Sequence, residues 1–430
     1  MEVANIFLNE TSLGHIFLAI LMLLFFAHLF GHIFSKMHLP RVIGEICGGL
    51  FLGPSGMGVI FPEVYNSLFN AFPEQGKILS LLYWIGLVLL MLIAGFKVNN
   101  SPGFKDQKLV LNLVISATLF PVLGGILYYH FYDFTPYQGK ASSDLSMAII
   151  VCISIAVTSI PVISKMFIDL GVIHSSFAKV VLATSTIQDL ILWVALGVAI
   201  KTAAEGSTNI YIIALISFLF LGGSLVLGPY LVNFMSKLRG NFLLESSPIG
   251  YILGICLFMA VLANLLGVNI VFGALMAGII ISTLSEKIFQ TARESISDFS
   301  LAFFIPIYFA IVGLKINLPL SFDMNLFVTF LFISSLLEIG SVFLALMVMK
   351  MNWLTSLNFG LAMNTRGGPG IVIASIAYEF SIINEAFFVV LILVAIITSL
   401  VSGAWFKFVI NRGWPLYEEP EIRRLRSESC

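Results

Sequence analysis

The sequence predicts an all-α protein that crosses a lipid bilayer about thirteen times. Hydrophobic residues make up 59% of the 430 residues and charged residues only 10%, whereas soluble domains contain about 45–50% and about 25%. Apolar runs of about 20 residues, the length that a helix needs to cross the hydrocarbon core, recur along the whole chain. Two of these runs contain helix-breaking residues near their centres, which predicts interrupted helices inside a bundle.

The apolar runs are evenly spread and leave no room for a sizeable soluble domain. The first runs from Ile16 to Phe34, with no basic segment before it and no small-residue cleavage site after it. We therefore interpret it as a retained helix rather than a signal peptide. The thirteen predicted spans are centred near residues 24, 49, 87, 119, 156, 189, 221, 257, 274, 307, 337, 369 and 396.

The distribution of basic residues predicts the orientation. With the N-terminus outside, seventeen of the 22 Lys and Arg side chains fall on the cytoplasmic side and four on the outer side, and Arg366 alone lies within a span. Cytoplasmic loops carry such an excess of Lys and Arg. We expect one transmembrane domain over residues 1–412 and a cytoplasmic tail over 413–430, which is too short to fold alone.

Composition argues against several classes of function. The net charge of −1 says nothing about partners, and we expect no nucleic-acid partner. The four cysteines are scattered, with no metal-ligand spacing, and are interpreted as small buried hydrophobic residues. The six histidines show no metal-ligand spacing either, and no serine–histidine–acid set for an intramembrane hydrolase is readable. We expect no enzymatic activity, no organic cofactor and no resident metal.

The fifth and twelfth spans carry the helix breakers. The fifth reads ISIAVTSIPVISKMF, with Pro161 near its centre, and the twelfth contains Gly367, Gly368, Pro369 and Gly370 in succession. Proline removes a backbone donor and clashes with the preceding turn, so we expect the helices to break at these residues. The two spans lie seven apart and run in opposite directions, which is typical of an inverted repeat whose broken helices meet around a binding site.

Asp189 is the strongest candidate for a functional residue, because a charge inside an apolar span is costly. In TSTIQDLILW, Ser185 lies one helical turn and Thr186 three residues before it, so both share its helical face, and we expect Thr158 and Ser159 to approach from the broken fifth span. These oxygen atoms suit a hard monovalent cation. The neighbouring Gln188 adds a carbonyl oxygen but no charge, so the simplest cycle exchanges one cation for one proton at Asp189.

Three further charges lie in or near spans. Glu338 is mid-span and needs a partner or a proton, so transport coupling and a structural role both remain open. Arg366 stands at the twelfth-span break, where we expect an ion pair with a carboxylate. Glu45 lies near the cytoplasmic end of a glycine-rich span, where a structural or gating role is favoured over direct transport.

Five motifs in order resemble those of the monovalent cation:proton antiporters, in the branch of the Kef-type potassium efflux membrane domains. They are LPRVIGEICGGLFLGPSGMG (39–58), GLVLLMLIAGFKVN (86–99), TSIPVISKMFIDLGVIHSSFAKVVLATSTIQDL (158–190), VFGALMAGIIIS (271–282) and NTRGGPGIVIASIAYEF (364–380). The resemblance covers roughly residues 13–410. The third-helix motif departs from the acidic ending that is usual in the family.

The resemblance implies a sodium/proton antiporter-like fold, with Asp189 as the carrier of cation and proton and with Thr158 and Ser159 at the helix crossing. Electrogenic relatives place a lysine in the helix before the last broken one, where this chain has Glu338. This difference, with Gln188, favours electroneutral exchange of Na⁺ or K⁺ for H⁺. The resemblance also implies a homodimer, elevator-like motion of one bundle, a bacterial plasma-membrane location and regulation, if any, by a separate subunit.

Two alternatives remain open. A passive or gated monovalent-cation channel could use the same mid-membrane acid only to select cations. A membrane sensor could retain the fold and transport nothing. The choice between Na⁺ and K⁺ also stays open, because it depends on the placement of oxygen atoms that a sequence does not give.

Overall fold

The computed structural model describes residues 9–37, 41–98, 107–205, 210–237, 240–284 and 287–417. Within these ranges the regular structure is helical, and an isolated bridge pairs Gln138 with Ile383. The predicted all-α fold is therefore confirmed. Leu39, Pro40 and Asn99 of the quoted motifs, and the tail beyond residue 417, lie outside the described residues.

The first half of the chain contains six of the predicted hydrophobic segments. Its helices are α1 (Glu10–Lys36), α2 (Arg41–Leu52), α3 (Met57–Ile60), α4 (Pro62–Phe69), α5 (Gln75–Val98), α6 (Gln107–Val114), the π-helical turn η1 (Ile115–Leu119), α7 (Phe120–Phe131), the 3-10 turn η2 (Thr135–Tyr137), α8 (Asp144–Ala156), α9 (Ile160–Asp169) and α10 (Ser176–Glu205).

The second half contains the other seven segments. Its helices are α11 (Ile210–Lys237), α12 (Phe242–Ser246), α13 (Pro248–Leu265), α14 (Ile270–Ser282), α15 (Lys287–Ala302), α16 (Phe304–Leu314), α17 (Leu318–Ser321), α18 (Met324–Val348), α19 (Trp353–Met363), α20 (Gly367–Glu379) and α21 (Glu385–Asn411).

Ten helical segments within the described ranges are long and apolar enough to cross a membrane. The other three predicted spans are the shorter α14 and the two interrupted pairs α8/α9 and α19/α20. Every predicted centre therefore falls on a helical segment or at a break.

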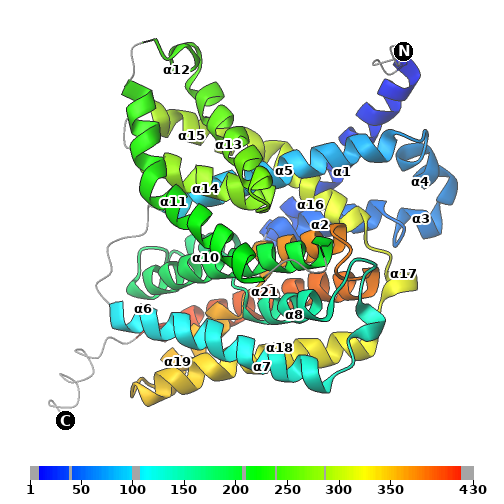
Figure 1. The fold of residues 1–430 in the computed structure, drawn as a ribbon. Helices are drawn as coiled ribbons and strands as arrows, with labels where there is room; N and C mark the ends of the chain where they lie inside the picture. Colours follow the sequence, from blue (N-terminus) through cyan, green and yellow to red (C-terminus); the bar gives the residue numbers. More distant parts are fainter. Residues whose placement is uncertain are drawn as a thin grey trace.

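The helices form two bundles that lie against each other (Figure 1). We call α1, α2, α5 and α13–α16 the scaffold bundle, because these helices pack mainly on one another. We call α6–α10 and α18–α21 the crossing bundle, because it contains both interrupted pairs. Helix α11 connects the bundles in the chain and packs on α10 and α14, one helix from each.

Small residues allow the scaffold helices to approach closely. A Cβ atom added at Gly49 of α2 would overlap the backbone of Ala310 on α16, and one added at Gly313 of α16 would overlap the backbone of Ile46 on α2. Helix association in membranes relies on such close packing, because lipid tails are as apolar as the side chains that they replace. The other two glycines of α2, Gly44 and Gly48, pack as closely on the α1 backbone, so contacts with both α1 and α16 explain the glycine-rich second span.

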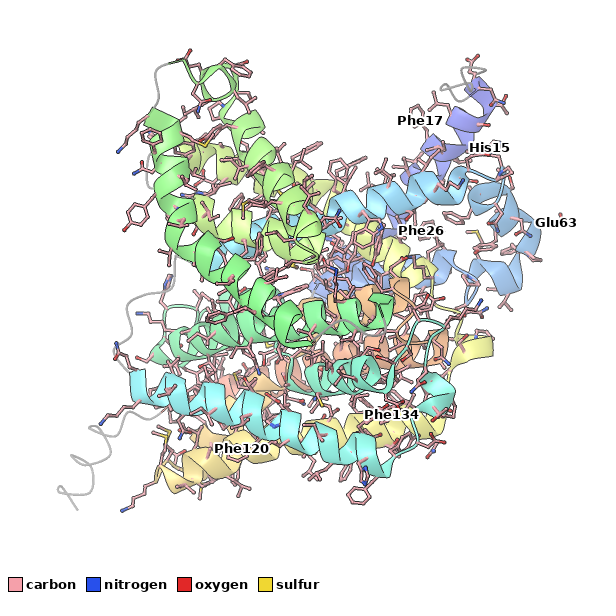
Figure 2. The ribbon with its side chains drawn as sticks, viewed as in Figure 1. His15, Phe17, Phe26, Glu63, Phe120 and Phe134 are labelled. Atoms are coloured by element: carbon pink, nitrogen blue, oxygen red, sulfur yellow. The ribbon has the colours of Figure 1, made fainter. Side chains whose placement is uncertain are left out.

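The lipid-facing surface is apolar, as a membrane protein requires. Phe17 on α1 and Phe120 on α7 both point away from the bundles (Figure 2), with exposed fractions of 62% and 52%. Phe134 lies instead at the end of the crossing bundle, buried against Tyr128 and Phe387.

The interruptions lie a few residues before the predicted breakers. Pro161 is within the first turn of α9, whose N-cap is Ser159, and Gly367, Gly368, Pro369 and Gly370 form the first turn of α20. Both predicted interruptions are therefore present, but the residues named as breakers begin the second half-helices instead of lying in the gaps. The first N–H groups of a helix have no intrahelical acceptor, so a proline there breaks no hydrogen bond.

Candidate functional site

The two interrupted spans cross in the middle of the crossing bundle. The Ser159 backbone N–H donates to the Thr365 carbonyl oxygen at 2.6 Å, and the Thr158 hydroxyl donates to the Met363 carbonyl oxygen at 2.5 Å. Backbone groups freed by the interruptions therefore satisfy one another, which irregular backbone at membrane depth requires.

Ser159 connects the first turns of both second half-helices. Its hydroxyl oxygen accepts from the Gly368 N–H at 3.0 Å and from the Val162 N–H at 3.3 Å. A Cβ atom added at Gly367 would lie 2.8 Å from that hydroxyl oxygen and would overlap the Val162 side chain. Glycine at position 367 is thus required by the close approach of α9 and α20.

Asp189 lies outside this crossing, at the interface between the two bundles. It lines a cavity of about 30 Å³ together with Thr186 of α10, Ile160 of α9, Pro369 of α20, Met91 and Ala94 of α5, Leu190, Trp193, Leu275 and Ile279. A volume above about 10–15 Å³ can hold a water molecule or an ion of similar size. Within the described chain, no hydrogen bond and no nearby charge acts on the Asp189 carboxyl group.

Of the four residues whose hydroxyl groups were expected around Asp189, Thr186 lines the cavity, whereas Ser185, Thr158 and Ser159 do not. Thr186, three residues before Asp189, lines the cavity, and its hydroxyl donates to the Leu182 carbonyl oxygen at 2.8 Å. Ser185 is fully buried, and its hydroxyl has no partner among the described residues. Thr158 and Ser159 use their hydroxyls to hold the crossing together. They stabilise the helix crossing next to the site and do not line its cavity.

Gln188 points to a different side of α10 from the Asp189 cavity. Its side-chain N–H groups donate to the carbonyl oxygens of Ala117, at 2.6 Å, and Ala156, at 2.5 Å. Ala156 ends α8, where carbonyl groups lack intrahelical donors, and Ala117 lies in the π-helical turn η1. Gln188 therefore fastens α10 to the broken span, and it does not line the Asp189 cavity.

Glu338 and Arg366 form a second buried polar group. Glu338 is fully buried and neither carboxyl oxygen has a hydrogen-bond partner among the described residues. Arg366 donates to the Ser334 hydroxyl at 2.6 Å and to the Asn364 side-chain oxygen at 2.9 Å. The two charges interact across a gap, and Gln188 also lies beside Glu338 without hydrogen-bond geometry. Among the described residues the expected direct ion pair is not formed, and the terminal guanidinium nitrogens of Arg366 bond to Ser334 and Asn364 instead.

A larger cavity adjoins the Asp189 cavity. Its volume is about 280 Å³, and Met91, Ala94 and Pro369 line both cavities. Arg41, Glu45 and Lys165 also line the larger cavity. The cavity lined by Arg41 and Lys165 is thus next to the Asp189 cavity.

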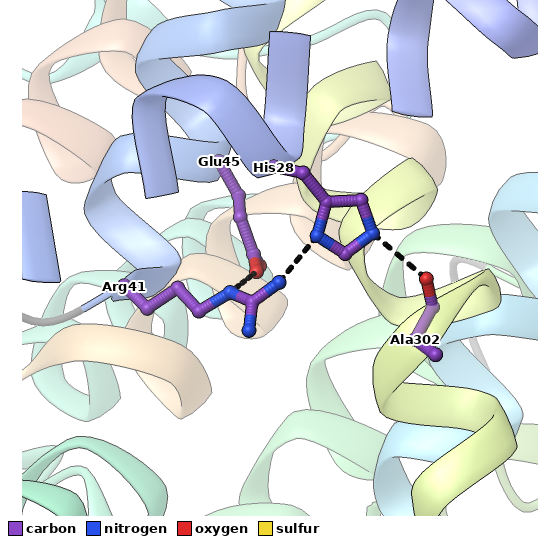
Figure 3. A network of polar contacts seen from close by, with 4 residues as sticks. All are labelled: His28, Arg41, Glu45 and Ala302. Carbon is purple, nitrogen blue, oxygen red and sulfur yellow. Dashed lines mark hydrogen bonds and ion pairs between the residues drawn. The ribbon is translucent and has the colours of Figure 1, made fainter. Parts of the chain in front are cut away.

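Glu45 is held in a polar network within the scaffold bundle (Figure 3). Arg41 pairs with the Glu45 carboxylate at 3.1 Å and also hydrogen bonds to the His28 ring. The other ring nitrogen of His28 donates to the Ala302 carbonyl oxygen at 2.9 Å. This donation leaves a lone pair on the first nitrogen, which suits it to accept from Arg41. Glu45 is therefore paired, in contrast to Asp189.

Sequence reasoning missed Ser334, Asn364 and Ser399. Ser334 precedes Glu338 by one turn and Asn364 precedes Arg366 by two residues, so helical spacing could have suggested the first. Ser399 accepts from the Gly367 N–H at 3.2 Å across 32 residues, and no local pattern signals that contact.

Comparisons with known proteins identify the family and the fold. A family model described as the transmembrane sodium/hydrogen exchanger matches residues 19–412. The Na(+)/H(+) antiporter NhaS4 of Synechocystis is 26% identical over 397 residues, covering 89% of this chain and 94% of that protein. The Na(+)/H(+) antiporter of Enterococcus hirae is 26% identical, covering 92% and 98%.

K(+)/H(+) antiporter 1 of Saccharomyces cerevisiae is 29% identical over 86% of this chain, which spans only 43% of that protein. The structure of the sodium proton antiporter MjNhaP1 from Methanocaldococcus jannaschii shares the fold, with a TM-score of 0.63 at 18% identity over 93% of this chain and 97% of that one. The family model covers most of the chain, and the fold and apolar helices agree with it. The chain is a multi-pass membrane protein that belongs to the sodium/hydrogen exchanger family.

Proposed function

We propose that this protein exchanges a monovalent cation, Na⁺ or K⁺, for H⁺ across a membrane, with Asp189 carrying each in turn. The observation that carries the proposal is the isolation of the Asp189 carboxyl group in a cavity at the interface of the two bundles. A carboxylate without a partner in such surroundings is costly, so the group needs either a proton or a cation.

Competition for one acid couples the two ions. Desolvation favours the neutral, protonated carboxylic acid, whereas a nearby cation favours the carboxylate. A cation that enters from the Arg41 side therefore displaces the proton, and a proton displaces the cation. Alternating access follows if the crossing bundle moves against the scaffold bundle, because the cavity lies between them. The protein would then act as a transporter and not as an enzyme.

The proposed exchange is electroneutral. Asp189 is the unpaired carboxyl group in the cavity, whereas Glu338 is sealed from it and faces Arg366. One carboxyl group that binds either one proton or one monovalent cation moves no net charge in a cycle. Relatives are named for either Na⁺ or K⁺, so the experiment below must decide which ion is exchanged.

Further elements of the proposal concern assembly and location. Residues 1–412 form the transmembrane domain and 413–430 a cytoplasmic tail, with the N-terminus outside. Loops predicted to share one side do contact each other, as between Ser55 and Ile316 and between Gln138 and Ile383, which supports the alternation of spans. A homodimer in a bacterial plasma membrane, the Kef-type branch and a separate regulatory subunit rest on the motifs alone.

The test is cation-dependent proton flux in proteoliposomes that carry a pH-sensitive dye. We expect saturable proton movement when Na⁺ or K⁺ is added outside, and no change when valinomycin and K⁺ clamp the membrane potential in the Na⁺ assay. Asp189→Asn should abolish the flux. Asp298→Asn, which changes a carboxylate outside both cavities, serves as the control.

The same assay separates the alternatives. A channel would carry cations along the clamped potential without moving protons, and a sensor would carry neither ion with Asp189 intact. Flux that survives Asp189→Asn would place the carrier elsewhere and contradict the proposal.

A further inference from the structure

Three buried hydroxyl groups lie between the bundles on the side opposite Arg41. Tyr83 of α5 and Tyr308 of α16 belong to the scaffold bundle, and Ser375 of α20 belongs to the crossing bundle. All three are nearly or fully buried, and they lie near one another without hydrogen-bond geometry. None of the three oxygens has a hydrogen-bond partner among the described residues.

Such a cluster is costly in a closed interface. A buried hydroxyl without a partner destabilises the state in which it is buried, and natural cores mostly satisfy such groups. Two tyrosines and a serine from facing bundles would gain water or ion contacts if the bundles separated at this point. A second state in which the cluster is hydrated would account for the presence of these residues.

The helix faces that carry the hydroxyls continue from the Asp189 region. On α20, Pro369 and Gly368 line the inner cavities, and Val372, Ser375 and Glu379 follow at spacings of four, three and four residues from Gly368. Residues with this spacing share one face of a helix. Ser375 therefore lies on the same face of α20 as the cavity-lining residues Gly368 and Pro369, and the buried Val372 lies between them on that face.

On α5 the corresponding residues share one face of the helix, and their numbers decrease from the cavities towards the hydroxyl groups. Ala94 and Met91 line the inner cavities, and Leu87 and Tyr83 follow one and two turns further along the same face. Leu87, like Val372, is fully buried. Leu87 on α5 and Val372 on α20 thus lie, along their helices, between the cavity-lining residues and the residues that carry the hydroxyls.

Beyond the hydroxyl groups, on the side away from Asp189, an ion pair joins the two bundles. Lys315, which caps α16, pairs with Glu379, the last residue of α20. The Lys315 ammonium also lies 4.1 Å from the centre of the Tyr83 ring. Both partners are only partly buried, at 28% and 27% exposed, so water can compete for the pair once the bundles move.

We propose that Tyr83, Tyr308 and Ser375 line the second half of the ion path, a passage for a hydrated monovalent cation that the Lys315–Glu379 pair holds closed in this structure. The proposal rests on the exchange function proposed above. In the alternate state the pair breaks, Leu87 and Val372 separate, and the hydroxyls contact the hydrated ion on its way to or from Asp189.

The first test measures opening without measuring transport. Ser375→Cys is made in a variant whose native cysteines are replaced, and a membrane-impermeant thiol reagent is applied from the Lys315 side of proteoliposomes. Glu379→Gln should raise the labelling rate about fivefold, because a partly exposed ion pair favours the closed state by about this factor. The charge-exchanged pair Lys315→Glu/Glu379→Lys should restore the parental rate.

Ser146→Cys provides the matched control, because Ser146 is a fully buried serine of the crossing bundle outside the proposed path. Its labelling should not change with Glu379→Gln. Unchanged labelling at position 375, or an equal rise at positions 375 and 146, would overturn the proposal. If the wild-type protein exchanged no ions, the function proposed above would fail, while labelling would still decide whether the passage opens.

The second test uses hydroxyl removal. Tyr83→Phe and Tyr308→Phe should each raise the KM for the cation at least threefold on the Lys315 side and leave it unchanged on the Arg41 side. Tyr128→Phe removes a hydroxyl that contacts Thr329 away from the path and should change neither value. Equal effects on both sides, or none, would contradict a role in the passage.

Discussion

Asp189 and Glu338 are both single carboxyl groups in long apolar helices, yet their surroundings differ. Asp189 borders a cavity, and within the described chain no charge acts on it. Glu338 is sealed and lies near Arg366, which two polar side chains hold in place. The comparison teaches that the cost of a buried charge can be met in two ways: by a fixed opposite charge, or by a ligand that comes and goes. The second way suits transport.

The largest expected effect is on transport by Asp189→Asn. The amide has the shape of the carboxylic acid but neither binds a proton nor attracts a cation at neutral pH, so cation-dependent proton flux should fall to that of empty liposomes. Thermal unfolding in detergent should change little, since the cavity stays lined by the same atoms. If Asp189→Asn instead prevented folding, Asp189 would have a structural role like that expected of Glu338.

Glu338→Gln and Arg366→Gln should show the reverse pattern. Removing one charge of a buried pair leaves the other uncompensated, which costs about 3–5 kcal/mol of folding free energy. The double variant should be more stable than either single variant, because neither charge remains. Thermal unfolding of the four proteins in detergent forms the double-mutant cycle. Additive losses would show that the two charges do not act on each other.

A smaller effect is expected at the crossing. Ser159→Ala leaves the N–H groups of Gly368 and Val162 without an acceptor and should cost about 1–3 kcal/mol. Ser154→Ala on the neighbouring helix removes a buried hydroxyl that has no partner among the described residues, and it should be neutral or stabilising. Denaturation of both variants checks this contrast. Equal losses would refute the role given to Ser159.

The smallest effect concerns Asp323, outside the spans. Its carboxylate accepts from the Leu326 N–H at 2.9 Å and from the Tyr137 hydroxyl at 2.8 Å, and these bonds hold the pKa of Asp323 below its ordinary 3.8. The stabilisation is present at neutral pH and is lost as the pH falls below 3.8 through the lowered value. Asp323→Ala should lose about 1 kcal/mol of helix capping.

Asp323→Asn supplies the control, because asparagine also caps helices but does not titrate. The wild-type protein should lose stability relative to Asp323→Asn as the pH falls from 5 to 3, measured by thermal unfolding. Parallel curves for the two proteins would exclude the proposed contribution of this carboxylate.

The sequence predicted the membrane segments well because hydropathy is a property of the chain itself. It misplaced the interruptions, since glycine and proline are tolerated in the first turn of α20 and the break lies just before them. It also grouped Gln188 with Asp189. Neighbours on a helix point about 100° apart, and Gln188 faces carbonyl groups freed near a π-helical turn that no sequence signal marks. Lys315 and Glu379 lie 64 residues apart and meet only in the fold.

Proton release on cation binding tests the central claim most directly. In weakly buffered detergent solution, adding Na⁺ or K⁺ to the purified protein should release about one proton per chain, because one carboxyl group exchanges its proton for the cation. Glu338→Gln should release the same amount, and Asp189→Asn should release none. Release that persists in Asp189→Asn and disappears in Glu338→Gln would contradict the assignment of Asp189 as the exchange site.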